Sequence, residues 1–118
     1  MLNMRRTGTA YEQCAALYLE QKGYRILEKN FRCRQGEIDL IALDGETIVF
    51  VEVKFRRDDR MGDGAEAVDI KKQKKIINCA RYYLFCHGEY LECPCRFDVV
   101  SVQGEDITLF RDAFWCGA

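Results

Sequence analysis

The alternation of apolar and polar residues along the chain predicts two helices and five strands. Apolar residues recur at helical spacing over residues 9–23, where a glycine ends the helix, and again from residue 65 to about residue 86. The strand segments are rich in β-branched and aromatic residues, and they cover residues 24–32, 37–43, 46–54, 96–102 and 106–112. The predicted order is therefore α, β, β, β, α, β, β, which describes an α/β sandwich with helices flanking a mixed sheet.

The spacing of apolar residues also predicts which side of each helix faces the sheet. In the first helix, Ala10, Cys14, Leu17 and Tyr18 form one stripe at helical spacing. The second helix has an apolar side, which includes Val68, Ile76, Cys79 and Tyr83, and a basic side that we expect to be exposed. Residues 55–64 are charged and contain glycine, so we expect them to form a loop.

Length and composition limit the function classes. The 118 residues are 48% hydrophobic and 31% charged, which suits a single domain over residues 1–118 and excludes a disordered chain. The formal charge is −1, so any nucleic-acid binding must come from a local basic patch rather than from bulk attraction. No apolar stretch approaches the ~20 residues that span a bilayer, and no signal peptide is visible, so we expect no membrane partner and a cytoplasmic location.

The cysteines do not predict a metal site. Seven is an odd number and the spacing is irregular, so in a reducing compartment they are most simply small buried hydrophobes. A zinc site would need paired cysteines or histidines, and the chain offers only Cys93, Cys95 and a distant His87. The sequence gives the cysteines no further role.

Charged residues interrupt the two strands on either side of Asp44-Gly45, a strong hairpin signal. If Leu43 faces Glu46, Asp39 lies opposite Phe50 and Glu52 lies opposite Glu37. Asp39 and Glu52 are then diagonal neighbours, about 7–8 Å apart, on the same face as Lys54. The residues predicted on the other face are Ile38, Leu40, Val49, Val51 and Val53.

Three carboxylates on one strand face repel one another unless a positive charge lies between them. A divalent cation with oxygen ligands would supply that charge, and so would Lys54. The simpler alternative is a cross-strand salt-bridge ladder of Glu37, Glu52 and Lys54 on an exposed sheet face. The residue pattern alone leaves both interpretations open.

The same residues carry a family resemblance. Gly36-Glu37-Ile38-Asp39-Leu40-Ile41, followed by Phe50-Val51-Glu52-Val53-Lys54, resembles the D…ExK signature of the PD-(D/E)XK, or restriction endonuclease-like, superfamily. More narrowly, these motifs resemble those of the YraN family of small bacterial proteins. Further matching features are Glu12, Gly23-Tyr24, Asn30, Arg57, Lys72 and Arg96-Phe97-Asp98. The resemblance runs from about Gly8 to Val102, and Ile38 stands where the superfamily's name has proline.

The resemblance implies a nuclease that hydrolyses DNA phosphodiester bonds with Mg²⁺ or Mn²⁺. It makes Asp39, Glu52, Lys54 and Glu12 the catalytic candidates, with Asp39, Glu52 and the Val53 backbone carbonyl as metal ligands. By pattern alone Glu12 is an ordinary exposed helix glutamate. The second-tier candidates are Glu37, Lys72 and Gln73, while Lys71 and Lys75 are expected to belong to a solvated face.

Arginines near the acidic strands are the candidates for phosphate binding, because their planar guanidinium groups form paired hydrogen bonds. They are Arg32, Arg34, Arg56, Arg57 and Arg60. The expected partner is DNA, with branched or single-stranded forms and a homodimer suggested by the resemblance to resolvases. The alternatives are a nucleic-acid-binding or scaffold module with little or no turnover, and a structural salt-bridged sheet without a ligand.

Overall fold

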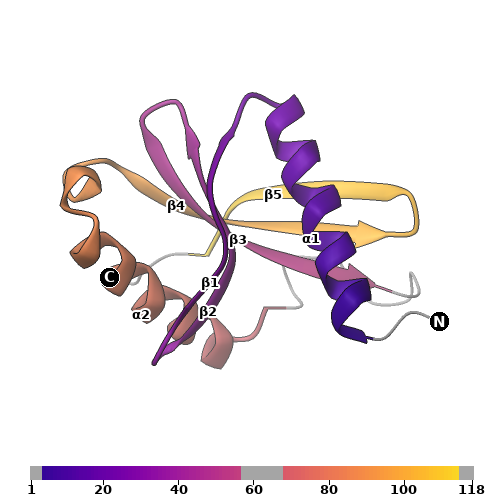
Figure 1. Ribbon diagram of the computed structural model, residues 1–118, viewed down its shortest axis with the longest axis horizontal. Coiled ribbons are helices and arrows are strands. Elements are labelled where there is room, and N and C mark those ends of the chain that lie inside the picture. The colour runs from indigo at the N-terminus through magenta and orange to yellow at the C-terminus, as the bar shows by residue number, and fades with distance from the viewer. Residues whose placement is uncertain (1–3, 57–67, 115–118) are drawn as a thin grey trace.

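The computed structural model describes residues 4–56 and 68–114, which form one mixed sheet and the helices packed on it (Figure 1). The sheet order is β1-β2-β3-β4-β5, with β3 and β4 parallel and all other neighbouring strands antiparallel. The strands are β1 (Arg25–Cys33), β2 (Gly36–Asp44), β3 (Thr47–Arg56), β4 (Cys95–Gln103) and β5 (Asp106–Phe114). The helices are α1 (Met4–Gln21), α2 (Ile70–Cys86) and the short 3₁₀ helix η2 (Gly88–Tyr90). The predicted α/β class and element order are confirmed.

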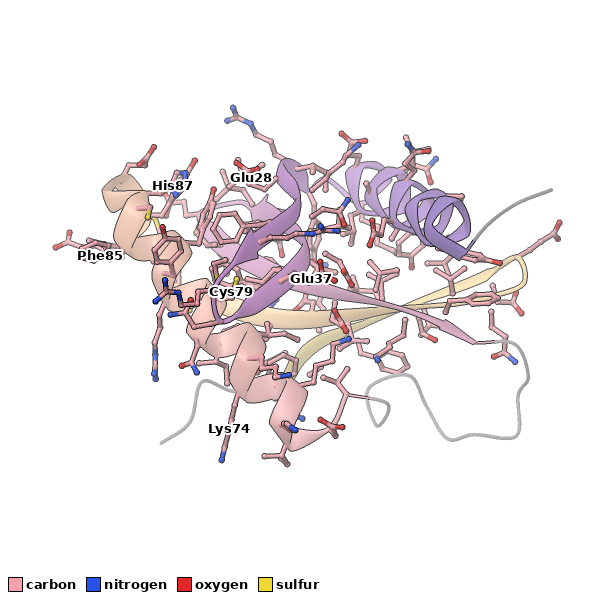
Figure 2. All side chains as sticks on the ribbon, turned by 60° about the horizontal axis from the view of Figure 1, so that its bottom comes forward. Glu28, Glu37, Lys74, Cys79, Phe85 and His87 are labelled. Carbon is pink, nitrogen blue, oxygen red and sulfur yellow. The ribbon has the colours of Figure 1, made fainter. Side chains whose placement is uncertain are left out.

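The two long helices cover opposite faces of the sheet. On one face, Ala15, Ala16 and Leu19 of α1 pack against a cluster that includes Val49 and Val51 of β3. On the other face, Ile76, Cys79 and Tyr83 of α2 pack against a cluster centred on Phe50. Figure 2 shows Cys79 between α2 and the strands. Strand β3 is therefore buried on both sides, which holds its side chains in fixed positions.

Local signals set the ends of the helices. Helix α1 is followed by Gly23 with a φ of +95°, a left-handed conformation that glycine adopts without strain. Helix α2 begins after Asp69, whose side chain accepts a hydrogen bond from the Lys72 backbone N–H. At its other end the His87 backbone N–H donates to the carbonyls of Tyr83 and Leu84.

Three predictions about the helices and cysteines were wrong. Helix α2 begins at Ile70 and not at residue 65, because Asp69 caps it there. In α1 the residues buried against the sheet are two small alanines and Leu19. Of the predicted stripe, Tyr18 packs beside them, but Ala10, Cys14 and Leu17 are exposed. Among the described cysteines only Cys79 is fully buried; Cys116 lies outside the described residues.

The predicted hairpin register was wrong by two positions. Asp44 pairs with Thr47 and Ile41 pairs with Phe50, so the turn residues are Gly45 and Glu46. Only Gly45 of the predicted Asp-Gly turn has a positive φ, of +62°, and Asp44 stays in the ladder as its last paired residue. At the end of the β2–β3 ladder away from the turn, the last pair is Leu40 with Val51. Asp39 of β2 and Glu52 of β3 lie just beyond this pair.

Strand β2 also changes the face of its side chains at Asp39. Leu40 packs in the α1 cluster, but Ile38 packs in the α2 cluster, whereas strict alternation predicts that both face the same side. The neighbouring strand β1 is irregular in the same region, where Asn30 has a φ of +55°. The prediction for Ile38 failed because β2 leaves the regular ladder with β3 at this point.

A fully buried carboxylate ties the ends of four strands together. The side chain of Asp98 accepts hydrogen bonds from Arg96 Nε at 2.9 Å, from Tyr24 Oη at 3.2 Å and from the Asp112 backbone N–H at 2.9 Å. Arg96 also donates to Asp44 at 3.0 Å. Every hydrogen-bonding direction of the buried group is used, so we interpret this cluster as structural rather than catalytic.

No helix in the described part of the chain has both the length and the apolar character required to cross a membrane.

We predict that Asp98→Ala lowers the free energy of unfolding by about 3–5 kcal/mol, because it removes the buried acceptor of the Arg96 guanidinium, the Tyr24 hydroxyl and the Asp112 N–H. The measurement is urea denaturation. Arg32→Ala is the matched control, since it removes an arginine from an exposed ion pair and should cost about 0–1 kcal/mol. Equal losses in the two variants would contradict the structural role of the Asp98 cluster.

Candidate functional site

Two buried carboxylates lie side by side where β2 separates from β3. The exposed fraction is 9% for Asp39 and 3% for Glu52. Asp39 Oδ2 accepts a hydrogen bond of 2.8 Å from the Val53 backbone N–H, so the carboxylate takes a position that a strand carbonyl would otherwise occupy. Burial, a hydrogen bond with Glu52 and the negative charge of Glu52 raise the pKa of Asp39 from 3.8 to about 9.

Two lysines approach the carboxylates from different elements. Lys54 follows Glu52 by two residues on β3, and its Nζ lies 3.8 Å from Glu52 Oε2. Lys72, in the first turn of α2, forms a closer ion pair with the same oxygen. Burial lowers the pKa of Lys54, and the neighbouring Lys72 charge lowers it further. Burial also disfavours the charge on Lys72, but its pairing with Glu52 outweighs this effect and raises its pKa.

Glu52 Oε2 is a buried oxygen with unused hydrogen-bonding capacity. Among the described residues no donor is aligned to form a hydrogen bond with it, although the Lys72 ammonium lies within ion-pair distance. Buried carboxylate oxygens in proteins are normally hydrogen-bonded or bound to a cation. In the described structure this oxygen is therefore balanced by lysine charges, in positions that a bound cation could take over.

The structure also places Glu12 and the Val53 carbonyl near this pair. Glu12 is half-buried on α1, and its charge makes the smallest of the contributions that raise the pKa of Asp39, after burial and the effects of Glu52. In an antiparallel ladder the N–H and C=O of one residue point to the same neighbouring strand. Because the Val53 N–H points to Asp39, its carbonyl faces the same side of β3.

The structure gives other partners or positions to Glu37 and Gln73 of the second-tier candidates and to the arginines. Glu37 forms an exposed ion pair with Arg32, at 3.1 Å, rather than a ladder with Glu52 and Lys54, so the predicted ladder does not form. The Gln73 side chain donates to the Val68 carbonyl and braces the start of α2. Arg34 is exposed in the turn between β1 and β2. The Arg56 side chain, Arg57 and Arg60 lie outside the described residues, and their phosphate contacts stay predictions.

Sequence reasoning missed a group of lysines next to the site. Lys71 and Lys75 are exposed, as expected for a solvated helix face, and together with Lys72 they also line a pocket between α2 and the start of β2. The available signal was their spacing: Lys75 lies one helical turn after both Lys71 and Lys72, so the three share one side of the helix.

The site's oxygen donors fit Mg²⁺ or Mn²⁺. Within residues 4–56 and 68–114 there is no cluster of three or more His, Cys, Asp or Glu side chains arranged to bind a metal ion. Mg²⁺ needs fewer protein ligands, because it is commonly held by one or two carboxylates together with water and substrate phosphate oxygens. Asp39, Glu52 and the Val53 carbonyl satisfy that requirement.

Comparison with known proteins gives one family and close relatives. The model of the "Uncharacterised protein family UPF0102" matches residues 11–102. A UPF0102 protein of Stutzerimonas stutzeri is 43% identical over 118 residues, covering 97% of this chain and 98% of the relative. A UPF0102 protein of Lachnoclostridium phytofermentans is 45% identical, with 96% of each chain covered. One from Nitrosomonas europaea is 47% identical, covering 91% of this chain and 92% of the relative.

We predict that Asp39→Asn stabilises the protein at pH 7 in the presence of a chelator, by more than about 1 kcal/mol. The folded state holds the Asp39 proton more tightly than the unfolded chain does. The free energy of unfolding of the parent protein should therefore fall as the pH rises from about 4 through about 9. Asparagine stays neutral and should flatten this slope.

The measurement is urea denaturation at several pH values, with Glu46→Gln as the control because Glu46 is an exposed carboxylate in the β2–β3 turn. An Asp39→Asn variant that keeps the full pH slope, or loses stability at pH 7, would contradict the assignment.

Proposed function

The chain belongs to the UPF0102 family, and we propose that it is a metal-dependent nuclease that hydrolyses phosphodiester bonds in DNA. Membership of the family that the sequence resembles, YraN, is confirmed by the same comparisons. The family is uncharacterised, so the proposal is based on the site and not on the relatives.

The observation that carries the proposal is the buried pair Asp39 and Glu52, with one lysine from β3 and one from α2 beside it. A structural ion pair has no need for a second buried carboxylate. A divalent cation would account for it, and Asp39, Glu52 and the Val53 carbonyl would hold that cation. When bound, Mg²⁺ or Mn²⁺ supplies a more acidic water and charge stabilisation at the phosphate.

Residues of the chain itself would do the remaining work. Lys54 is half-buried beside Glu52, and the reduced pKa of its ammonium suits a group that orients or deprotonates the attacking water and then stabilises the developing negative charge. Glu12 would complete the acidic site from α1. The basic residues around the acids, among them Arg34, would hold the polyanionic backbone over the site.

A second candidate function is a nucleic-acid-binding module with little turnover. The observation that favours it is the ion pair between Lys72 and Glu52, which supplies positive charge to the acids without a metal. Metal binding and hydrolysis distinguish the two functions.

We predict that Mn²⁺ raises the melting temperature of the protein and that Asp39→Asn or Glu52→Gln abolishes this shift, because each removes one anionic ligand. The measurement is thermal melting with and without the metal. Glu46→Gln should keep the shift, since it neutralises an exposed carboxylate away from the acidic pair. Equal shifts in the parent protein and in Asp39→Asn would contradict the metal site.

We predict that Lys54→Ala lowers DNA cleavage by about 100-fold or more, while DNA binding and the Mn²⁺-induced melting shift stay close to those of the parent protein, because Lys54 acts mainly in the transition state. Cleavage is measured on linear duplex, single-stranded, flap and four-way DNA with Mg²⁺ or Mn²⁺, beside a Glu52→Ala control.

Lys74→Ala is the matched lysine control, since Lys74 is exposed on α2. A parent protein that binds these DNAs but cleaves none of them would favour the binding module. A destabilised Lys54→Ala protein with unchanged cleavage would exclude this role for Lys54.

A further inference from the structure

A pocket of about 430 Å³ lies between the first two turns of α2 and the start of β2. Its volume is within the range in which proteins bind small ligands or parts of larger ones. The residues that line it are Gly36, Glu37, Asp69, Lys71, Lys72, Lys75 and Ile76. The floor is narrow because α2 packs closely on Gly36, where an added Cβ would lie 3.4 Å from Lys75 Cβ.

The charges of the pocket favour an anion. Three of its residues are lysines, and its two carboxylates are both engaged elsewhere. Asp69 Oδ1 accepts the Lys72 backbone N–H as the cap of α2, and Glu37 Oε2 is paired with Arg32 Nε. Three ammonium groups gathered on one side of a helix repel one another, and an anion between them would remove that cost.

The pocket is connected to the acidic site through a single side chain. Lys72 lines the pocket and forms the ion pair with Glu52. At the opposite side, Gly36 and Glu37 follow the β1–β2 turn, which contains the exposed Arg34 and Gln35. Cationic residues therefore extend from the acidic pair, through the pocket, to that turn.

We propose that this pocket binds a backbone phosphate of the nucleic-acid substrate, at a position along the strand beyond the bond that is cleaved. The inference rests on the proposed function, because it assigns a second contact to the substrate of that site. Lysine binds phosphate as a point charge and reads no base, so the contact is independent of sequence. It also requires an oligonucleotide, since a small diester at the acidic pair would not extend into the pocket.

The test compares Lys71→Gln and Lys75→Gln with Lys74→Gln in the full chain. All three variants lose one positive charge from the same helix, but Lys74 is absent from the pocket lining, and Figure 2 shows it pointing away from the sheet. The first measurement is binding of a fluorescent single-stranded oligonucleotide, in chelator, over a range of salt concentrations. The second is metal-supported hydrolysis of that oligonucleotide and of bis(4-nitrophenyl) phosphate.

For Lys71→Gln and Lys75→Gln we expect affinity to fall about fivefold at 0.1 M salt and the slope of log K against log salt to shrink by about 0.7, which is the value for one lost contact to a single strand. Hydrolysis of the oligonucleotide should show a higher KM with little change in kcat, while hydrolysis of the small diester should be unchanged. Lys74→Gln should match the parent protein in every measurement.

Different experimental results would overturn this inference and the proposed function. If the parent protein binds the oligonucleotide and the three variants bind it equally well, the pocket carries no phosphate and only this inference is overturned. If the parent protein neither binds the oligonucleotide nor hydrolyses either substrate, both are overturned. Melting temperatures close to that of the parent protein would show that the lysine variants are folded.

Discussion

The constraint on which the rest of the site depends is the burial of two carboxylates next to each other. Asp39 and Glu52 are both more than nine-tenths buried, and like charges this close cannot both stay ionised without a nearby cation. The raised pKa of Asp39 and the ion pairs that Glu52 forms with Lys72 and Lys54 are direct consequences of this placement. The irregular end of β2 is a further consequence of this placement, because the Asp39 carboxylate, and not a backbone carbonyl of β2, accepts the hydrogen bond from the Val53 N–H.

The fold makes this placement rigid. Strand β3 lies in the middle of the sheet, with a parallel neighbour on one side, and clusters of apolar side chains cover both of its faces. Glu52 and Lys54 thus extend from a strand that cannot shift without disturbing both clusters. The Lys72 backbone is held by the Asp69 cap at the start of α2, and its exposed side chain reaches Glu52 as an ion pair. Charged groups held in place by packing keep their geometry when a substrate binds, which a site built on loops does not achieve.

The sequence predicted the elements well and their exact pairing less well, for identifiable reasons. Periodicity located every long helix and strand, but Asp44-Gly45 did not reveal that Asp44 stays in the ladder, and the predicted register was therefore wrong by two. Glu52 and Lys54 were still placed on one face correctly, because both lie on β3 and alternation along one strand does not depend on the register. Ile38 was misplaced because alternation fails where β2 leaves the ladder. The catalytic candidates themselves came from the family resemblance, since charge patterning alone left a salt-bridge ladder equally open.

Two arrangements of charge neutralise the acidic pair, and they explain why Lys72 matters. In the arrangement seen here, Glu52 is paired with an ammonium and the neutral form of Asp39 is favoured, so the buried pair carries little net charge. If the proposed divalent cation binds, both carboxylates would be ionised and the cation would balance them without the lysine. The Lys72 ammonium would then be available to the pocket that it also lines, where the opposing carboxylates already have partners. Lys72, which stabilises the metal-free acids, is therefore well placed to bind phosphate once a metal replaces it. The acidic pair and the lysine-lined pocket are thus connected through this one side chain.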